Sequence, residues 1–202
     1  MLADPTSSYV TNAVMAMGRK MDDILIEAAT GTAYYGKTGS STVTFPSASE
    51  IAVDYVESGS AANSNLTIGK LRRARFLLDY TEATTEGQYD LFLVVSPAQI
   101  QSLLRTTEVT NSDYNTVKAL VAGEIDTYMG FKFIKSNRLT VASNIRSCLA
   151  FERQGLLLAT GMEVRVDVGP RRDKRNSIQV YVCGTFGATR MWEEKVLRIK
   201  CD

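Results

Sequence analysis

The residues most suited to carry chemistry lie between Gly31 and Thr38. The stretch Gly31-Thr-Ala-Tyr-Tyr-Gly36-Lys37-Thr38 matches the phosphate-binding pattern G-x-x-x-x-G-K-S/T in full. In nucleotide-binding proteins this loop follows a strand and opens a helix, whose N-terminal amides hold the phosphates. Here a helical pattern precedes the loop, and Gly39-Ser-Ser followed by β-type residues comes after it. A P-loop nucleotide site is therefore the disfavoured alternative, and nucleotide-dependent thermal stabilisation is its check.

Most other familiar catalytic chemistry is excluded because the chain contains no histidine. This removes Ser-His-Asp and Cys-His catalysis and histidine-ligated zinc or haem. The three cysteines, Cys148, Cys183 and Cys201, are widely spaced and form no CxxC pair, which is typical of reduced thiols in a cytosolic protein. We therefore expect no enzyme, and we assign no catalytic residue, no cofactor and no metal ligand.

Length and charge limit the kinds of protein that the sequence can encode. A chain of 202 residues suits one large domain or two small ones and can bury a core without disulfides. Its net charge of +1 differs from the strong basic excess of duplex-binding proteins. No basic segment followed by an apolar one opens the chain, and charges interrupt every long apolar window. We therefore expect neither a signal peptide nor a membrane span.

The element that organises the rest is a long helix predicted over residues 4–30. Asp4-Pro5 is suited to open it, because Asp accepts a hydrogen bond at the N-cap and Pro needs no partner at the first position. Apolar residues then recur every three or four positions, at Val10, Ala13, Val14, Met17, Met21, Ile24, Leu25 and Ala28. We expect Gly31 to end the helix in a left-handed conformation. A helix of about 39 Å must lie along one side of its domain as a spine.

The segment after this helix is expected to be an exposed connection. A hairpin is predicted between residues 32 and 49, with a strand at 43–45. Residues 51–56 are expected to form a further strand or a passage from strand to loop. Thr67 is then suited to cap a helix that ends near Thr84. Its Arg72, Arg73 and Arg75 form a solvated helix face or, as the alternative, a face toward an anion or a subunit.

The middle of the chain is predicted to be a compact α/β subdomain. Its expected elements are a buried strand at 91–95, a helix opened by Ser96-Pro97, an amphipathic helix at 114–125 and a strand at 131–134.

The last quarter of the chain is predicted to contain a long hairpin. Apolar and polar residues alternate over 163–168 and again over 178–182, the pattern of half-buried strands. Residues 169–176 between them are too polar for anything but the hairpin tip. Strands at 148–151 and 196–199 and a short helix at 154–159 are expected beside it.

Four stretches in this order carry a resemblance to a known family. They are the long helix with Ala13–Asp23 and Ala28–Gly31, the segment Ser96–Leu104, the segment Gly123-Glu-Ile with Met129–Asn137 and Leu139, and the terminal hairpin followed by Phe186–Arg190 and the last strand. Together they resemble the major capsid proteins of tailed bacteriophages, which have the HK97-type coat fold. Each motif alone is weak, but the four cover nearly the whole chain.

The resemblance implies an α+β protein with the HK97-like coat fold: a long spine helix, a peripheral β-sheet with a terminal hairpin, and an axial α/β subdomain. It assigns residues 1–59, with the spine helix at 4–30, to the first part of the peripheral domain. Residues 60–160 become the axial domain and residues 161–202 the second part of the peripheral domain. The implied function is a structural coat subunit that forms an icosahedral shell through repeated subunit contacts.

The resemblance also implies a contact at the hairpin tip. Arg171, Arg172, Lys174 and Arg175 fall where the family has a loop that touches neighbouring capsomers near three-fold positions. We expect them to meet an acidic surface, because arginine pairs well with carboxylates, and the alternative is a solvated tip. One branch of the family joins an asparagine of this hairpin to a lysine of an extended loop. Asn176 lies on the hairpin, but we assign no cross-link.

Family members carry an N-terminal arm and an extended loop before the spine helix. Because the predicted spine starts almost at Met1, we expect both parts to be missing from this sequence, which leaves shell formation by this form open.

The implied partners are copies of the chain itself, arranged as pentamers and hexamers of a capsid. A scaffolding protein and packaged DNA, held non-specifically on the inner face, are further expected partners, and no membrane is involved. The expected location is the virion capsid, after synthesis in the bacterial cytoplasm. The alternatives are an encapsulin-like compartment shell, which shares the fold, and a monomeric ligand-binding α/β domain with a deep pocket.

Overall fold

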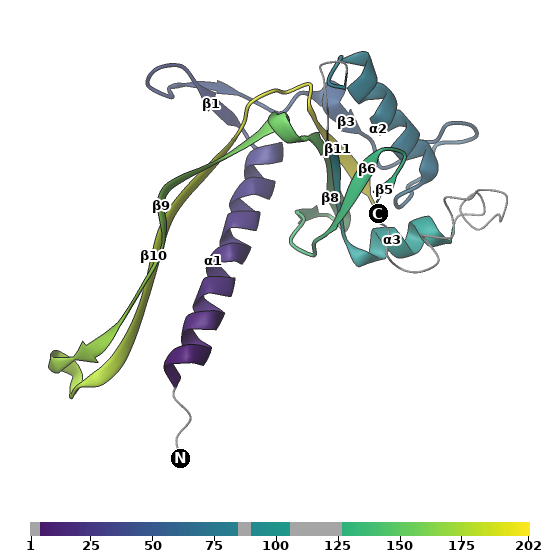
Figure 1. Cartoon of the computed structure of the whole chain (residues 1–202). Coiled ribbons are helices and arrows are strands. Elements are labelled where there is room, and N and C mark those ends of the chain that lie inside the picture. Colours follow the sequence, from purple (N-terminus) through teal and green to yellow (C-terminus); the bar gives the residue numbers. More distant parts are fainter. Residues whose placement is uncertain (1–4, 85–89, 106–126) are drawn as a thin grey trace. The chain divides into compact units, whose positions relative to one another are not determined.

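The computed structural model describes residues 5–84, 90–105 and 127–202 (Figure 1). The chain divides into two compact units. We call residues 1–25 with 158–188 the hairpin unit, and residues 26–157 with 189–202 the core unit. The expected division into a peripheral domain (1–59 and 161–202) and an axial domain (60–160) stays a prediction.

The long helix α1 spans Pro5–Thr30 and confirms the predicted spine helix. Asp4, the predicted N-cap, lies outside the described residues. The predicted left-handed conformation of Gly31 is wrong, because its φ is not positive. The Gly31 amide donates to the Glu27 carbonyl at 2.8 Å, and a Cβ at this position would lie 2.7 Å from the same oxygen. Glycine is needed here for close approach to the preceding turn.

A small hairpin follows the helix. Strands β1 (Ala33–Tyr35) and β2 (Ser41–Val43) pair in antiparallel fashion. The predicted hairpin is thus confirmed, although its second strand ends at Val43 and does not cover 43–45. Gly36 (φ 87°) and Gly39 (φ 64°) shape the turn between them, in backbone conformations that favour glycine.

The predicted segment 51–56 is a passage from strand to loop, the second of its two expected forms. After a 3₁₀ turn, η1 (Ser47–Ser49), strand β3 contains only Glu50–Ile51. The backbone turns away because the Val53 carbonyl accepts the Ser64 amide at 3.0 Å and the Lys70 ammonium at 2.9 Å. These bonds replace the ladder bonds that a longer strand would make.

The core unit is built on a mixed sheet in the order β3-β11-β8-β4-β6-β5, with β7 beside β8. Its further strands are β4 (Leu91–Val95), β5 (Thr127–Tyr128), β6 (Phe131–Lys135), β7 (Val141–Ala142), β8 (Ile145–Glu152) and β11 (Val196–Cys201). β4 runs parallel to β6, and β8 runs antiparallel to both β4 and β11. The strands predicted at 91–95, 131–134, 148–151 and 196–199 are confirmed, the last three within longer strands.

Two helices of the core unit begin where the sequence predicted. α2 (Ile68–Tyr80) starts after Thr67, whose hydroxyl accepts the Lys70 amide at 3.3 Å. It buries Leu71, Ala74 and Leu78 and ends before the expected Thr84. α3 (Pro97–Leu104) starts after Ser96. The helix predicted at 114–125, and Gly123 of the family motif, lie outside the described residues.

The short helix predicted at 154–159 is wrong. A 3₁₀ turn, η2 (Arg153–Gly155), leads directly into strand β9 (Leu156–Arg171). Gly155 is buried, and a Cβ there would lie 3.0 Å from atoms of Lys195 and Val196. The Gly155 carbonyl accepts the Met191 amide at 2.9 Å. These tertiary contacts hold the chain extended and outweigh the helix propensity of the leucines that follow.

The long hairpin of the last quarter is confirmed. β9 pairs with β10 (Ser177–Arg190) in a two-stranded sheet, which we call the ribbon (Figure 1). A 3₁₀ turn, η3 (Arg172–Lys174), lies within the predicted tip at 169–176, and strand β9 extends into the start of that segment.

Candidate interface surfaces

The hairpin tip presents a dense group of cations. Arg175 (φ 53°) and Asn176 (φ 57°) both adopt the left-handed conformation, which turns the chain from η3 into β10. All four cationic side chains predicted to make contacts, Arg171, Arg172, Lys174 and Arg175, are exposed here. The structure therefore brings the predicted contact residues together on one exposed turn.

One of these cations is already paired within the tip. The Arg171 guanidinium donates to both carboxylate oxygens of Asp173, with Nε at 2.9 Å from Oδ1. This pairing raises the pKa of Arg171 and lowers the pKa of the Asp173 carboxyl. Arg172, Lys174 and Arg175 have no ion-pair partner among the described residues. The tip thus offers three cations to an outside anion.

The ribbon has one apolar face and one polar face. A Cβ on Gly161 would lie 3.4 Å from Thr185, so these two positions oppose each other across the strands. Because side chains alternate between faces, odd-numbered residues of both strands share one face and even-numbered residues the other. The odd face carries Glu163, Arg165, Asp167, Gln179 and Tyr181. The even face carries Met162, Val164, Val166, Val168, Ile178, Val180 and Val182.

The predicted half-burial of these strands is confirmed at Val164, Val180 and Val182, but not at the apolar residues nearer the tip. Val166, Val168 and Ile178 on the apolar face are 36%, 42% and 59% exposed. Within the described part of the hairpin unit, no side chain is buried, and all buried hydrophobic residues belong to the core unit. The alternating pattern therefore predicts the strands and their faces, but the described residues of this unit leave part of the apolar face exposed.

Arg190, the last residue of β10, contacts the end of α1. Its side chain is fully buried, and Nη1 donates to the carbonyls of Ala29 at 3.2 Å and Gly31 at 2.9 Å. Its Nη2 lies 3.5 Å from the Val43 carbonyl and 3.4 Å from a Glu193 carboxylate oxygen. The final carbonyls of a helix lack partners within the helix, so Arg190 supplies donors and positive charge to the C-terminus of α1.

A second buried cation, Lys70 of α2, fastens the loop before α2 to the sheet. It is 0% exposed, and its ammonium donates to the carbonyls of Val53 (2.9 Å), Ser64 (2.6 Å) and Lys200 (2.9 Å). Burial lowers the pKa of Lys70. All of its donors are used inside the protein, so this lysine serves the fold.

The predicted arginine face of α2 has internal partners. Arg72 pairs with Glu57 at 3.0 Å and Arg75 with Asp79 at 2.9 Å. The Arg73 guanidinium lies 5.3 Å from the ring centre of Phe76. These contacts suit the solvated helix face that the sequence favoured.

The loop matching the nucleotide pattern does not form a phosphate cradle. Gly36, Lys37 and Thr38 lie in the turn between β1 and β2, and a strand follows them where a nucleotide site needs a helix. The Thr38 hydroxyl bonds with the Ser40 hydroxyl at 3.0 Å. The geometry therefore contradicts a P-loop nucleotide site in this segment.

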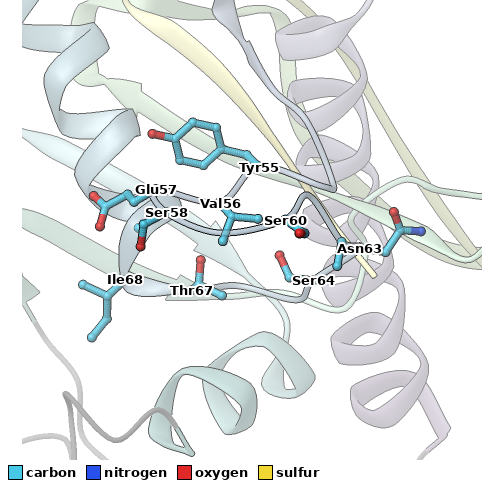
Figure 2. Close-up of a pocket in the computed structure, with 11 residues that line it drawn as sticks. Tyr55, Val56, Glu57, Ser58, Ser60, Asn63, Ser64, Thr67 and Ile68 are labelled. Atoms are coloured by element: carbon cyan, nitrogen blue, oxygen red, sulfur yellow. The ribbon is translucent and has the colours of Figure 1, made fainter.

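A cavity of about 310 Å³ lies between the loop at residues 55–64 and the start of α2 (Figure 2). Its only charged lining residue among those described is Glu57, which already pairs with Arg72. The rest of the lining that the structure describes is neutral and includes several serines and an asparagine.

The described residues give no sign of a metal centre or a membrane helix. They hold no group of three or more aspartate, glutamate or cysteine side chains suited to a metal ion. Among the helices that the structure describes, none is long and apolar enough to cross a membrane. Cys148, Cys183 and Cys201 are free thiols.

Sequence reasoning missed Arg190 and Lys70, although a signal was present for each. Lys70 stands four and eight residues before Ala74 and Leu78, on the buried face of α2. Arg190 has the same even parity as the apolar face of the ribbon. A charged residue at a position where the pattern expects an apolar one indicates a buried charged side chain with partners inside the protein.

Comparisons with known proteins point to one family. The family described as phage capsid protein matches residues 1–202, and no curated protein matches the chain. A solved chain from Mycobacterium phage Che8 is 17% identical, with 95% of this chain covered and a TM-score of 0.62. The capsid of cyanophage Pam1 is 12% identical over 100% of this chain and 70% of its own, with a TM-score of 0.68.

An encapsulin from Synechococcus elongatus PCC 7942 is also similar, at 12% identity over 98% of this chain, with a TM-score of 0.59. These likenesses show the HK97-type fold, as the resemblance implied. The chain spans 61% of the length of the Che8 chain and 66% of that of the encapsulin.

Proposed function

The chain belongs to the phage capsid protein family, and on this premise we propose that it is a major capsid subunit that assembles into the icosahedral shell of a tailed bacteriophage or prophage. The observation that carries the proposal is the hairpin unit, which has an apolar ribbon face and, among its described residues, no buried side chain. A unit without its own core is explicable if neighbouring copies supply the missing contacts. Closed shells are built from such repeated heterologous contacts.

The hairpin tip is the proposed contact between neighbouring subunits. Arg172, Lys174 and Arg175, which have no ion-pair partner in the part of the chain that the structure describes, are suited to an acidic surface on another copy, and Arg171 supports the turn through Asp173. Charge-assisted bonds between arginine and carboxylate are among the stronger polar contacts at interfaces. We place the tip contact between capsomers, with 1–59 and 161–202 as peripheral domain and 60–160 as axial domain.

The further partners in this proposal are a scaffolding protein and packaged DNA. A net charge of +1 suits a shell that encloses DNA without gripping its sequence. The subunit is made in the bacterial cytoplasm, acts in the virion capsid and carries no catalytic role. An encapsulin-like compartment is the weaker alternative, because the matching family is that of phage capsids.

The test of the proposal is the solution mass of the purified chain, by light scattering, with negative-stain images of the large fraction. Rings of five or six subunits, sheets, tubes or shells support the coat function. A chain that remains monomeric at every concentration contradicts self-assembly by these residues.

The tip contact is tested by Arg172→Glu/Arg175→Glu, which reverses the charge of two of the tip cations. We expect the protein concentration needed for assembly to rise by about tenfold or more. The two glutamates would then face the acidic surface of the neighbouring copy and repel it. The matched control, Arg172→Lys/Arg175→Lys, keeps the charge and should assemble nearly as the wild type. Equal assembly by the reversed and the conserved variants would exclude the tip as a contact.

A further inference from the structure

Two buried thiols of the core unit lie side by side on neighbouring strands. Cys148 in β8 is opposite Ile199 in β11, and Cys201 stands two residues farther along β11. Residues two apart share one face of a strand, so Cys148 and Cys201 are diagonal neighbours on the same face of the sheet. Both residues are 0% exposed, and the Cys148 thiol donates a hydrogen bond to the Cys201 sulfur. The fold thus brings together two cysteines that are far apart in the sequence.

The buried ammonium of Lys70 lies beside this thiol pair. It donates to the carbonyl of Lys200, the residue before Cys201, at 2.9 Å. Its other two acceptors are also neutral backbone carbonyls, so its positive charge favours a nearby anion. The hydrogen bond from Cys148 and the charge of Lys70 lower the pKa of the Cys201 thiol, although burial opposes them. Hydrogen bonding to Cys201 and burial raise the pKa of Cys148, so Cys201 is the more acidic thiol of the pair.

A thiolate beside a cation and in contact with a second thiol is the arrangement that a redox-active cysteine pair needs. Thiolate character determines which sulfur an oxidant attacks first, and a neighbouring thiol then converts the oxidised sulfur into a disulfide. Cys201 meets the first condition through Lys70, and Cys148 meets the second. Cys183 on β10 is half-buried and lies outside this pair, so it serves as a comparison within the same chain.

Among the described strands, only β8 pairs with the end of β11 that carries Cys201. β3 pairs with β11 at Arg198 and Ile199 and stops there, whereas β8 continues opposite Cys201. Cys201 is also the last residue of its strand. Strand ends open at a low cost in free energy, so a local opening here admits a small oxidant without unfolding of the core unit.

We infer that Cys148 and Cys201 form a redox-sensitive pair that hydrogen peroxide converts into a disulfide between β8 and β11. The Cys201 thiolate attacks one peroxide oxygen, the O–O bond breaks, and hydroxide leaves while the sulfur becomes a sulfenic acid. The Cys148 sulfur then attacks the Cys201 sulfur, the S–S bond forms and the S–O bond breaks. The departing oxygen takes the Cys148 proton and leaves as water. In sum, the two thiols lose two electrons and two protons, and one peroxide molecule becomes two water molecules.

The disulfide would stabilise the fold through the length of chain that it encloses. It closes a loop of about 50 residues, which contains the whole ribbon, and a loop of this length loses much conformational entropy in the unfolded state. For a chain of this size we expect the melting temperature to rise by about 5–10 °C. The inference goes beyond the proposed coat function and applies whether or not the chain assembles, because both thiols belong to the core unit.

The disulfide is tested on the purified, reduced chain. Hydrogen peroxide is added, the remaining thiols are blocked, and linked peptides are identified by mass spectrometry without reduction. We expect one peptide pair, joined through Cys148 and Cys201, and the matched control Cys183→Ser should give the same pair. If Cys148 and Cys201 stay free at a peroxide concentration that oxidises Cys183, the inference is overturned. A link that includes Cys183 would overturn it as well.

The order of attack is tested by two single variants. Cys148→Ser leaves the Cys201 sulfenic acid without a partner, so a dimedone probe should label Cys201. In Cys201→Ser, we expect the probe to label Cys148 at least about tenfold more slowly, because Cys148 is the less acidic thiol. Equal labelling rates would refute Cys201 as the sulfur attacked first.

The stabilising effect is tested by thermal melting of the oxidised and the reduced wild-type chain. Cys148→Ser treated with the same peroxide is the control, and its melting temperature should not rise. Equal melting temperatures for the two wild-type forms would refute the stabilising role. The coat function is decided separately, by the solution mass, and none of these outcomes changes it.

Discussion

Replacing Arg190 by methionine removes the contact between the last residue of β10 and the carbonyls at the end of α1. The guanidinium is fully buried and donates to Ala29 and Gly31 at the end of α1. Hydrogen bonds to charged groups contribute about 1.5–3 kcal/mol each to the free energy of unfolding. The methionine variant loses these bonds, but it no longer has the cost of burying a charge, which offsets part of the loss. Since removing one member of a buried charged contact costs about 3–5 kcal/mol, we expect Arg190→Met to lower the free energy of unfolding by about 3 kcal/mol.

The assay is urea denaturation of the unassembled chain, followed by the fluorescence of Trp192. This is the only tryptophan of the chain, and it lies two residues from Arg190. With a slope near 2 kcal/mol per molar urea, the expected loss lowers the unfolding midpoint by about 1.5 M. Arg190→Lys keeps the charge but loses the forked geometry, and it should give about half of that shift.

The control is Arg172→Met at the exposed tip, which removes the same side chain from a site without a described partner. We expect it to change the free energy of unfolding by less than about 0.5 kcal/mol. If the midpoints of Arg190→Met and the wild type agree within about 0.3 M, Arg190 does not stabilise the fold by capping α1. If Arg190→Met does not fold, the smaller shift of Arg190→Lys still decides the question.

Two further predictions concern the core unit. Lys70→Met removes the donor shared by three backbone carbonyls and should lower the free energy of unfolding by about 2–4 kcal/mol. The exposed neighbour Arg72→Met should cost less than about 1 kcal/mol, and equal melting temperatures for the two variants would count against the role of Lys70. Burial raises the pKa of Glu50, but hydrogen bonds from Lys200 and Arg198 outweigh it and hold that pKa below its ordinary value of 4.5. As the pH falls, the unfolded state therefore binds the proton first, so this contribution to stability is present above pH 4.5 and is lost as the pH falls through the folded pKa. Glu50→Gln should make the free energy of unfolding fall less steeply at acidic pH. An unchanged pH dependence would contradict this prediction.

Local signals in the sequence predicted the elements better than their surroundings. Thr67 was identified as a cap because the bond it makes lies within one helical turn. Residues 154–159 were assigned wrongly because Gly155 is held by Met191 and Lys195, which are distant in the sequence. Helix propensity contains no information about such contacts.

The candidate site shows the same division. The charged tip was predicted from composition, and alternation predicted the two faces of the ribbon. Half-burial was predicted correctly for Val164, Val180 and Val182 but not for Val166, Val168 and Ile178, because a period-two pattern shows which face is apolar and not what covers it. Lys70 and Arg190 stand at positions that the pattern makes apolar, but the pattern does not show their acceptors, which are backbone carbonyls of other segments.

The edge strands of the core sheet affect how the protein behaves at high concentration. The outermost strands, β3 and β5, contain two residues each. Such short edges offer few free backbone groups to a strand from another molecule, which is a common protection against fibril growth. The longer edges of the ribbon carry Glu163, Arg165 and Asp167, whose charges discourage continuous strand stacking. The fold can thus be present at very high local concentration while its sheets remain separate.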